Sequence, residues 1–313
     1  MKMQIKIQKD VLLAPYTTFK IGGPARFFVE VKNEEELIEA LEYAKENNLE
    51  YFILGGGSNI LVSDKGFDGM VIKLQDTRYK IQDTNITCGA SIAISKLVIE
   101  SVKNSLTGLE WAMGIPGTVG GAVRGNAGAF GGEIAQNIVS VRAVKIFNTE
   151  SKIIKLKKED CKFSYRNSIF KEDTGWIILS VIMNLKQGNT EVSNTKIKEI
   201  VRKRIKKQPK YPSAGSFFKN PFVKNEKIIQ EFEKETGVKN SDRKIPAGWL
   251  IEQVGLKGKK IGGAQVSEKH ANFIINTGDA TAEDVIILSS LIKQKVRTRF
   301  GVQLQEEVQL VGF

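Results

Sequence analysis

The spacing of apolar and polar residues along the chain predicts a mixture of helices and strands. A Gly-Gly-Pro turn within 15–31 leads into an apolar, strand-like run. Asn33 can then cap a helix with an acidic first turn, whose apolar residues recur on one face at Leu37, Ala40, Leu41 and Ala44. The apolar tetrapeptide 51–54 predicts a buried strand. Together these segments predict a β-α-β unit that ends in a loop at the carboxyl ends of its strands.

Later segments continue the mixture. They predict short strands within 70–90, a helix over 92–103, a hairpin of 139–147 and 152–156, a strand over 176–185 and a basic helix over 190–207. Farther along, the pattern predicts helices over 228–235, 248–254 and 283–300, and a final strand over 301–311. A polar break at 187–189 indicates a domain boundary. We therefore expect one domain over 17–188, with 302–313 returning near it, and a second over 198–301.

Two glycine-rich segments interrupt this pattern. In Gly114–Gly132, eight of 19 residues are glycine and three are alanine, and Leu54–Ile72 has three consecutive glycines after the strand 51–54. Glycine accepts positive φ and has no Cβ, so successive peptide N–H groups can converge on a phosphate. Neither a P-loop nor a dinucleotide G-x-G-x-x-G is present. These glycines could simply form tight turns; their occurrence in two long segments favours one large anionic ligand.

Composition and charge narrow the function. With 313 residues, 41% hydrophobic and 26% charged, the chain has the composition of a globular protein. We expect neither a membrane span nor a signal peptide, and hence a cytoplasmic protein. The net charge of +12 favours anionic partners. The one dense basic run, 202–207, lacks interleaved aromatic residues, so phosphorylated small molecules are favoured over nucleic acid.

The cysteine and histidine content restricts the chemistry further. Cys88 and Cys161 are far apart and lack neighbouring ligands, which favours reduced core thiols over a disulfide or a metal site. His270 is the only histidine, so a zinc centre or a Ser-His-Asp triad is difficult to assemble. A general acid or base must then come from Ser, Tyr, Lys, Arg, Asp or Glu.

Four further motifs complete a resemblance to a known family. They are the residues 163–168 (FSYRNS), the basic run through Arg204, the residues 214–221 (AGSFFKNP) and the residues 304–308 (LQEEV). Together with PYTTFKIGG, LGGGSNILVSDKGFDG and GIPGTVGGAVRGNAGA, they resemble the UDP-N-acetylenolpyruvoylglucosamine reductase (UDP-N-acetylmuramate dehydrogenase, MurB) family. The likeness runs from about residue 17 to residue 312, with the motifs in the order of the family.

The resemblance implies an α+β fold: an FAD-binding domain of the vanillyl-alcohol-oxidase (PCMH) type, made of two subdomains, and a C-terminal α+β substrate-binding domain. NADPH would reduce a noncovalent FAD, and the vinyl carbon of UDP-N-acetylenolpyruvoylglucosamine would then receive the hydride, giving UDP-N-acetylmuramate for peptidoglycan synthesis. We expect a monomer with no nucleic-acid or membrane partner and no metal. The implied cofactor-binding residues are Gly55, Gly56, Gly57, Ser58, Asn59, Gly114, Ile115, Pro116, Gly117, Thr118, Gly120, Gly121, Asn126, Ala127 and Gly128.

The resemblance also implies three catalytic residues. Arg166 matches the arginine that faces the substrate carboxylate, to which its planar fork is suited. Ser216 matches the proton donor, and Gly215 before it allows the backbone to turn. Glu307 matches a glutamate that would assist in its protonated form. Arg204 and Asn220, with the adjacent Lys219, match contacts to the substrate diphosphate.

Structural explanations remain open for several of these residues. Arg166 could be an ordinary surface arginine, Ser216 a helix cap, and the helix around Arg204 a solvated face. His270 is expected to be a structural hydrogen-bonding residue. Of the neighbouring Glu306 and Glu307, alternation along a strand turns only one inward, and the spacing favours Glu307.

One departure from the broader family concerns length. The 49 residues between Arg166 and Ser216 are too few for the loop, bearing a substrate-covering tyrosine, that the longer class inserts there. The chain therefore resembles the shorter, type II class, and Gln265 or the segment near His270 are candidates for covering the sugar and uracil. The nearest competing functions are an FAD-dependent sugar or lactone oxidase of the same fold and a basic nucleic-acid-binding protein.

Overall fold

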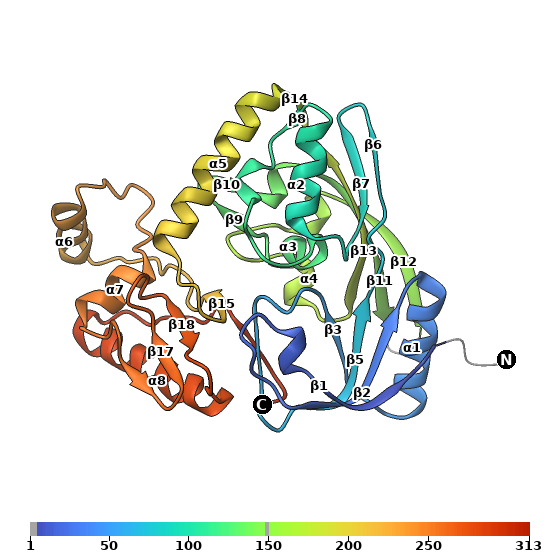
Figure 1. Cartoon of the computed structure of the whole chain (residues 1–313), viewed down its shortest axis with the longest axis horizontal. Coiled ribbons are helices and arrows are strands. Elements are labelled where there is room, and N and C mark those ends of the chain that lie inside the picture. Colours follow the sequence, from blue (N-terminus) through green and yellow to red (C-terminus); the bar gives the residue numbers. More distant parts are fainter. Residues whose placement is uncertain (1–4, 148–149) are drawn as a thin grey trace. The chain divides into compact units, whose positions relative to one another are not determined.

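The computed structural model describes residues 5–147 and 150–313. The chain forms two compact units, each built from separate segments (Figure 1). The first unit contains residues 1–11, 25–57 and 68–206, and the second contains 12–24, 58–67 and 207–313. Two short stretches of the N-terminal part therefore belong to the same unit as the C-terminal third of the chain.

The first sheet of the first unit has the strand order β1-β2-β5-β3. Its strands are β1 (Gln8–Leu12), β2 (Pro24–Val31), β3 (Tyr51–Leu54) and β5 (Phe67–Leu74). The helix α1 (Glu34–Glu46) joins β2 to β3, and Asn33 caps it by accepting a hydrogen bond from the Glu36 N–H. Apolar residues of α1 pack with residues of the sheet in one core. β3 pairs in parallel with β5, so the predicted β-α-β unit ends at Leu54, immediately before the first glycines.

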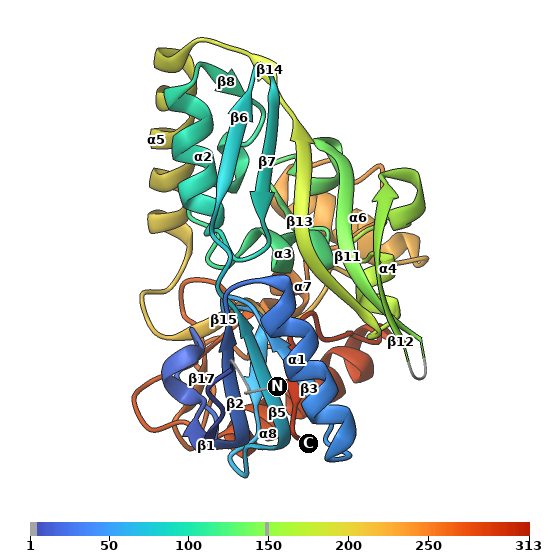
Figure 2. The same cartoon turned by 90° about the vertical axis from the view of Figure 1, so that its right-hand side faces the viewer.

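The second sheet of this unit has the order β12-β11-β13-β7-β6 (Figure 2). Its strands are β6 (Tyr79–Gln82), β7 (Asn85–Gly89), β11 (Ile138–Phe147), β12 (Glu150–Lys157) and β13 (Trp176–Asn184). The helices α2 (Ile94–Lys103) and α3 (Val119–Arg124) share a core with this sheet. The remaining elements are β8 (Leu106–Thr107), β9 (Gly128–Ala129), β10 (Gly132–Glu133), α4 (Ile169–Glu172), β14 (Lys186–Gln187) and α5 (Thr190–Lys207).

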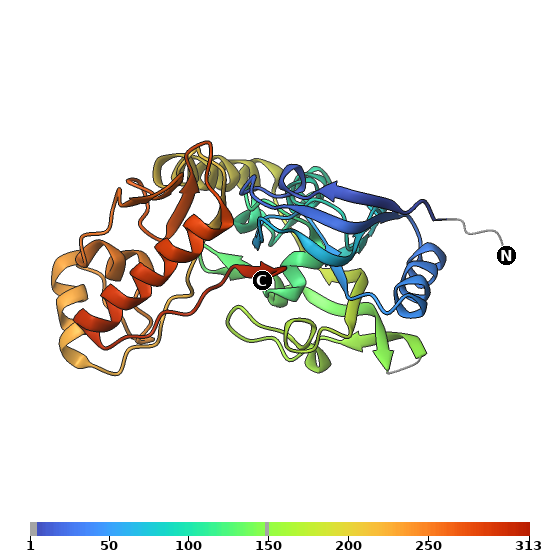
Figure 3. The same cartoon turned by 90° about the horizontal axis from the view of Figure 1, so that it is seen from below.

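The second unit is built around a small sheet with the order β15-β18-β17-β16. These strands are β15 (Ser213–Ser216), β16 (Lys260–Ile261), β17 (Ala264–Val266) and β18 (Phe273–Asn276), and the helices are α6 (Glu226–Thr236), α7 (Ala247–Gln253) and α8 (Ala282–Phe300). Figure 3 shows α8 lying along this unit, where it packs on β16 and β17. A separate parallel pair joins β4 (Ile60–Val62) to β19 (Gln309–Val311).

Most of the predicted elements are confirmed, but the final strand is wrong in extent. Only Gln309–Val311 form a strand, because only these residues pair with β4. Gly301 takes φ +66 as the C-cap of α8, so the chain turns there instead of continuing as a strand. The predicted domain ranges 17–188 and 198–301 remain predictions; the compact units divide the chain differently, since α5 up to residue 206 belongs to the first.

The N-cap of α8 provides a test of how its unit is stabilised. Thr281 Oγ1 accepts a hydrogen bond from the Asp284 N–H at 3.0 Å in a reciprocal capping box. Thr281→Ala should lower the free energy of unfolding by about 1 kcal/mol, measured by urea denaturation. The control is Thr298→Ala on the same helix, which should change stability by less than about 0.5 kcal/mol. Equal effects of the two substitutions would contradict a capping role.

Candidate functional site

The two glycine-rich segments meet backbone to backbone inside the first unit. A Cβ added to Gly55 would lie 2.9 Å from Thr118 Oγ1, and one added to Gly56 would lie 2.6 Å from Gly117 Cα. Real Cβ atoms do not approach other atoms so closely, so side chains are excluded at this contact. The two segments, about 60 residues apart in the sequence, therefore form one feature of the fold.

Several backbone amides at this contact make no hydrogen bond with the residues that the structure describes. Around Thr118, the Ile94 N–H donates to Gly117 O at 3.1 Å and the Val119 N–H to Ile92 O at 3.0 Å, which fixes the second loop. Within the described residues, no hydrogen bond uses the amides of Gly56, Gly57, Gly117 or Thr118. We call these four residues the anion cradle. Main-chain N–H groups without covering side chains are suited to bind phosphate oxygens.

Arg124 was missed by the sequence reasoning. It ends α3, and its guanidinium has no hydrogen bond or ion pair among the described residues. Burial lowers the pKa of Arg124, because the charged form loses water. A largely desolvated cation without a protein partner fits an anionic ligand. The available signal was that Arg124 is the only charged residue in Gly114–Gly132.

The other predicted cofactor residues of this segment have mostly structural contacts. The buried Asn126 side chain donates to Ser164 O at 2.9 Å and to Glu133 Oε2 at 3.2 Å, and accepts from the Ala135 N–H at 3.2 Å. Further backbone amides are used inside the fold: Gly120 donates to Ala90 O, Ile115 to Ala112 O, Ala127 to Ala122 O and Gly121 to Thr118 Oγ1. These residues shape the loop, and the Asn126 side chain is committed to holding it.

Arg166 is held against the same segment. Its Nη2 donates to Gly128 O at 2.7 Å, and its guanidinium lies 5.3 Å from the ring centroid of Tyr165. Its own carbonyl accepts from Lys171 Nζ at 3.2 Å, and its φ is +55, in a turn closed by the Ser164–Asn167 bridge. Arg166 is therefore an ordered, partly buried side chain, unlike a solvated surface arginine.

Arg204 is the inward-facing member of the basic helix α5. Its Nε donates to Met113 O at 2.8 Å and its Nη2 to Trp111 O at 3.5 Å, beside the predicted Gly114. The guanidinium carbon lies 5.1 Å from the ring centroid of Phe130. Burial lowers the pKa of Arg204, whereas its neighbour Lys203 is exposed. Arg204 is thus partly buried and hydrogen-bonded, whereas the neighbouring cations of the helix are exposed to solvent.

A buried carboxylate ties α5 to the start of the glycine-rich segment. Glu110 accepts hydrogen bonds from Thr107 Oγ1 at 2.5 Å, from the Gly108 N–H at 2.9 Å and from Ser193 Oγ at 2.5 Å. Burial alone would raise the pKa of Glu110, but these hydrogen bonds, from Ser193 and Thr107 first, outweigh it and hold the pKa below its usual value. Glu110 therefore fixes the helix that carries Arg204 relative to the residues next to Gly114.

In the second unit, Ser216 ends β15. The strand is held at its start, where the Ser213 N–H donates to Thr18 O at 3.1 Å and Thr18 Oγ1 donates to Ser213 O at 2.7 Å. Gly215 takes φ +79, which a residue with a Cβ rarely adopts. Ser216 therefore belongs to a strand and is no helix cap, and the motif containing Thr18 supports its backbone.

Glu307 lies beside this strand. Its N–H donates to Phe217 O at 2.8 Å, next to Ser216. The neighbouring Glu306 forms an ion pair with Lys293 at 2.5 Å. The fold brings the backbones of the two predicted catalytic residues together from positions 91 apart in sequence.

Two predicted ligand-binding residues of this unit hold structural positions. Asn59 Nδ2 donates to Glu307 O at 3.1 Å, and Asn220 Oδ1 accepts from the Ala247 N–H at 3.0 Å, at the start of α7. Lys219, which is half-buried, donates its N–H to Gln305 O at 2.9 Å. His270 Nδ1 accepts from the Asn272 N–H at 3.2 Å, and burial lowers the pKa of His270, as a structural histidine requires.

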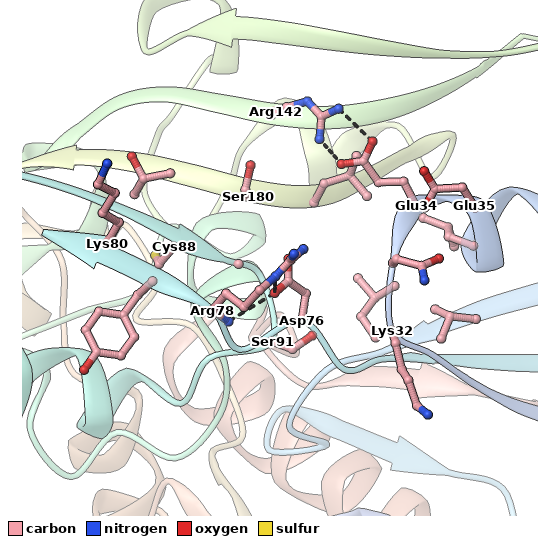
Figure 4. A pocket seen from close by; sticks show the side chains of 18 residues that line it. Lys32, Glu34, Glu35, Asp76, Arg78, Lys80, Cys88, Ser91, Arg142 and Ser180 are labelled. Carbon is pink, nitrogen blue, oxygen red and sulfur yellow. Dashed lines mark hydrogen bonds and ion pairs between the residues drawn. The ribbon is translucent and has the colours of Figure 1, made fainter.

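A cavity of about 580 Å³ in the first unit contains none of the predicted residues (Figure 4). Four of its charged side chains form two pairs: Arg142 Nη2 donates to Glu34 Oε2 at 2.7 Å, and Arg78 Nε to Asp76 Oδ1 at 2.8 Å. The Arg142 hydrogen bond lowers the pKa of Glu34, and Arg78 lowers that of Asp76. The charges of these four side chains neutralise one another in pairs, so they do not together form a binding site for a charged ligand.

The described residues offer neither a metal site nor a membrane span. They contain no group of three or more His, Cys, Asp and Glu side chains placed to hold a metal ion. None of their helices is both long and apolar enough to span a membrane. Cys88 and Cys161 are buried free thiols, and burial raises the pKa of each to about 12, so neither is a nucleophile at neutral pH.

Comparisons with known proteins identify the family of each half of the chain. The family model of the UDP-N-acetylenolpyruvoylglucosamine reductase C-terminal domain matches residues 207–311, and that of an FAD binding domain matches residues 25–155. The UDP-N-acetylenolpyruvoylglucosamine reductase of Caldanaerobacter subterraneus subsp. tengcongensis is 42% identical over 299 residues, or 95% of this chain and 91% of that protein. The enzyme of Clostridium novyi is 39% identical over 309 residues, or 98% and 92%.

A solved structure shows the same likeness. The crystal structure of UDP-N-acetylenolpyruvylglucosamine reductase from Thermus caldophilus has a TM-score of 0.77 and 34% identity, covering 98% of this chain and 99% of that one. These matches confirm the predicted resemblance and the predicted fold class, an FAD-binding domain followed by a C-terminal domain of the reductase family. They favour the reductase over the oxidase and nucleic-acid-binding alternatives.

The hydrogen bonds of Glu110 predict that the stability of the protein depends on pH. Because the pKa of Glu110 is lowered in the folded protein, its stabilisation is fully present above the unfolded pKa of about 4.3 and is lost as the pH falls below it, through the lower folded pKa. The stability deficit of Glu110→Gln relative to the natural protein should therefore be large at pH 7 and shrink below about pH 4, in thermal unfolding followed by circular dichroism. The exposed Glu42→Gln is the control; a deficit for Glu110→Gln that does not change with pH would contradict the network.

Proposed function

Because the chain belongs to the UDP-N-acetylenolpyruvoylglucosamine reductase family, we propose that it reduces the enolpyruvyl ether of UDP-N-acetylenolpyruvoylglucosamine to UDP-N-acetylmuramate, a step of peptidoglycan precursor synthesis, with NADPH as reductant. The observation that carries this proposal is the anion cradle, in which two glycine-rich loops of the FAD-binding domain hold backbone amides that no hydrogen bond among the described residues uses.

The residues of the first unit fit FAD. The cradle offers N–H donors from Gly56, Gly57, Gly117 and Thr118 to a pyrophosphate, and Arg124 offers a desolvated positive charge in the same segment. No cysteine or histidine lies in either glycine-rich segment, so the flavin would be held without a covalent bond. When bound, FAD supplies hydride transfer between a nicotinamide and an unsaturated carbon.

Arg166 is proposed to bind the substrate carboxylate. Reduction of the vinyl carbon places negative charge on the neighbouring carbon and its carboxylate, so a fixed cation there stabilises the transition state. The Gly128 carbonyl holds one Nη of Arg166 before the substrate arrives. Preorganisation of this kind removes the cost of ordering a long side chain during the reaction.

Ser216 is proposed to donate the proton to the other carbon of the former double bond. A hydroxyl is a weak acid, so it requires a firm position and a hydrogen-bonded environment. The hydrogen bond from Thr18 to Ser213 O and the left-handed conformation of Gly215 fix the position of the Ser216 backbone. Glu307, next to the same strand, is proposed to act in its neutral, protonated form, which can donate a hydrogen bond without opposing the developing negative charge.

Arg204, Lys219 and Asn220 are proposed to bind the substrate diphosphate. Arg204 is a half-desolvated cation without a carboxylate partner among the described residues, as a diphosphate ligand requires. Asn220 also caps α7, so its side chain would serve both the fold and the ligand.

We propose that the chain belongs to the type II class and acts as a cytoplasmic monomer. The 49 residues between Arg166 and Ser216 are used by the ordered elements α4, β13, β14, α5 and β15, which supports the absence of the long tyrosine loop. NADPH and nucleotide sugars are cytoplasmic metabolites, which supports the location.

Within the proposed function, the first prediction concerns the anion cradle. Gly56→Ala should weaken FAD binding by at least about tenfold, because its Cβ would lie 2.6 Å from Gly117 Cα and push the loops apart. Flavin absorbance per purified chain and a fluorescence titration with FAD measure this. Gly125→Ala is the matched control, since its Cβ would make an ordinary 3.6 Å contact with Gly121 O at a negative φ. Equal affinity of both variants for FAD would refute the proposal that the anion cradle binds the pyrophosphate of FAD.

The second prediction concerns Ser216. Ser216→Ala should leave flavin reduction by NADPH nearly unchanged and slow flavin reoxidation by the enolpyruvyl substrate by about a hundredfold or more, in stopped-flow absorbance. Ser290→Ala, at an exposed position of α8 in the same unit, is the control and should leave both half-reactions nearly unchanged. A comparable loss in both half-reactions of Ser216→Ala would exclude a specific role in proton donation.

A further inference from the structure

The small hairpin Gly128–Glu133 has a turn whose conformation does not suit its sequence. β9 and β10 pair Gly128 with Glu133 and Ala129 with Gly132, which leaves Phe130 and Gly131 as a two-residue turn. Their φ values are +51 and +82. A two-residue hairpin turn with both central φ positive strongly prefers Asn-Gly or Asp-Gly, because a bulky side chain in the left-handed region is strained.

Packing does not explain this phenylalanine either. Phe130 is 51% exposed, so the ring gains little from burial. Neither turn chemistry nor the core favours an aromatic side chain here. Strained backbone that the surrounding structure maintains is found mainly at active sites and ligand-binding sites. The turn at Phe130 therefore indicates a functional role.

The contact that the Phe130 ring does make is with Arg204. The guanidinium carbon lies 5.1 Å from the ring centroid, within the range of a cation–π interaction. The edge of the same guanidinium is held by Met113 O, 2.8 Å from Nε, and by Trp111 O, 3.5 Å from Nη2. Two carbonyls and one ring thus fix both the position and the plane of Arg204.

The hairpin and the two carbonyls belong to one rigid arrangement. A Cβ on Gly132 would lie 2.4 Å from the Trp111 ring, so the hairpin is seated directly on the segment that supplies the carbonyls. The same hairpin supplies Gly128 O to Arg166. Among the described residues, no carboxylate pairs with Arg204, so its charge remains available to a ligand.

We propose that Phe130 is a positioning residue: its ring, held in a strained turn, orients the Arg204 guanidinium so that the N–H donors not used by Met113 and Trp111 meet a diphosphate oxygen of the substrate. This inference rests on the proposed role of Arg204 in binding the diphosphate. It assigns a ligand-binding purpose to a residue that touches Arg204 and not the reacting atoms.

The test uses Phe130→Asn in the FAD-loaded full chain. Asparagine suits the turn, so thermal stability should be kept or rise, while the affinity for UDP, measured by calorimetry, should fall about tenfold. The KM for the enolpyruvyl substrate should rise by a similar factor with kcat changed less than about twofold, and flavin content should stay the same. Phe130→Tyr should retain affinity, and Phe130→Gly serves if the asparagine variant fails to fold.

Two controls separate positioning from other effects. Phe147→Asn removes another half-exposed phenylalanine beside a cation, Lys145 at 5.8 Å, and should leave UDP affinity unchanged. In an Arg204→Met background, Phe130→Asn should have almost no further effect, because the two residues act through one contact.

Each other outcome is decisive. Unchanged UDP affinity in a stable Phe130→Asn variant overturns the inference, as does the same loss in the Arg204→Met background, which would show that the ring contacts the ligand directly. If UDP does not bind to the natural protein, the proposed function itself fails, whatever Phe130 does. If UDP binds but Arg204→Met binds it equally well, the role of Arg204 fails and the inference about Phe130 fails with it.

Discussion

The close approach of Gly55 and Gly56 to Gly117 and Thr118 is the constraint on which the first unit depends. A distance of 2.6 Å from a hypothetical Cβ to Gly117 Cα leaves room for main chain only. The amides of the anion cradle can bind an anion because no hydrogen bond in the described part of the chain uses them. The local absence of side chains is therefore as much a part of the site as any residue that carries charge.

The residues on either side of Gly117 and Thr118 in the chain support the charged side chains that the loops cannot provide. Trp111 and Met113, which precede this contact, hold Arg204, and Gly128, which follows it, holds Arg166. Glu110 joins α5 to the same segment through Ser193. Arg204 and Arg166 are both oriented by backbone carbonyls. A carbonyl orients the guanidinium but leaves its full positive charge, which is what binding of an anionic substrate requires.

The sequence was informative where the structural signal is local. The capped, acidic start of α1 and the polar flanks of α5 lie within a few residues of each helix end, and both helices were predicted with accurate limits. The final strand was overextended because its extent depends on pairing with β4, about 250 residues away. Asn59, Asn126 and Asn220 could be assigned to ligands from motifs, but only the fold shows that their amides hold Glu307, Ser164 and α7. Side-chain amides suit either purpose, so composition cannot separate the two.

Hydrogen bonds and strand pairing explain why two short N-terminal segments belong to the second unit. Residues 12–24 supply Thr18, which clamps β15 before Ser216, and residues 58–67 supply β4, which pairs with β19 just after Glu307. Asn59, two residues beyond the cradle glycine Gly57, holds the Glu307 carbonyl directly. The loop proposed to bind the cofactor pyrophosphate is thus covalently continuous with a strand that fixes a proposed catalytic residue. Glu307 is thus held through Asn59 and Ser216 through Thr18, so two short N-terminal segments each support one of the proposed catalytic residues.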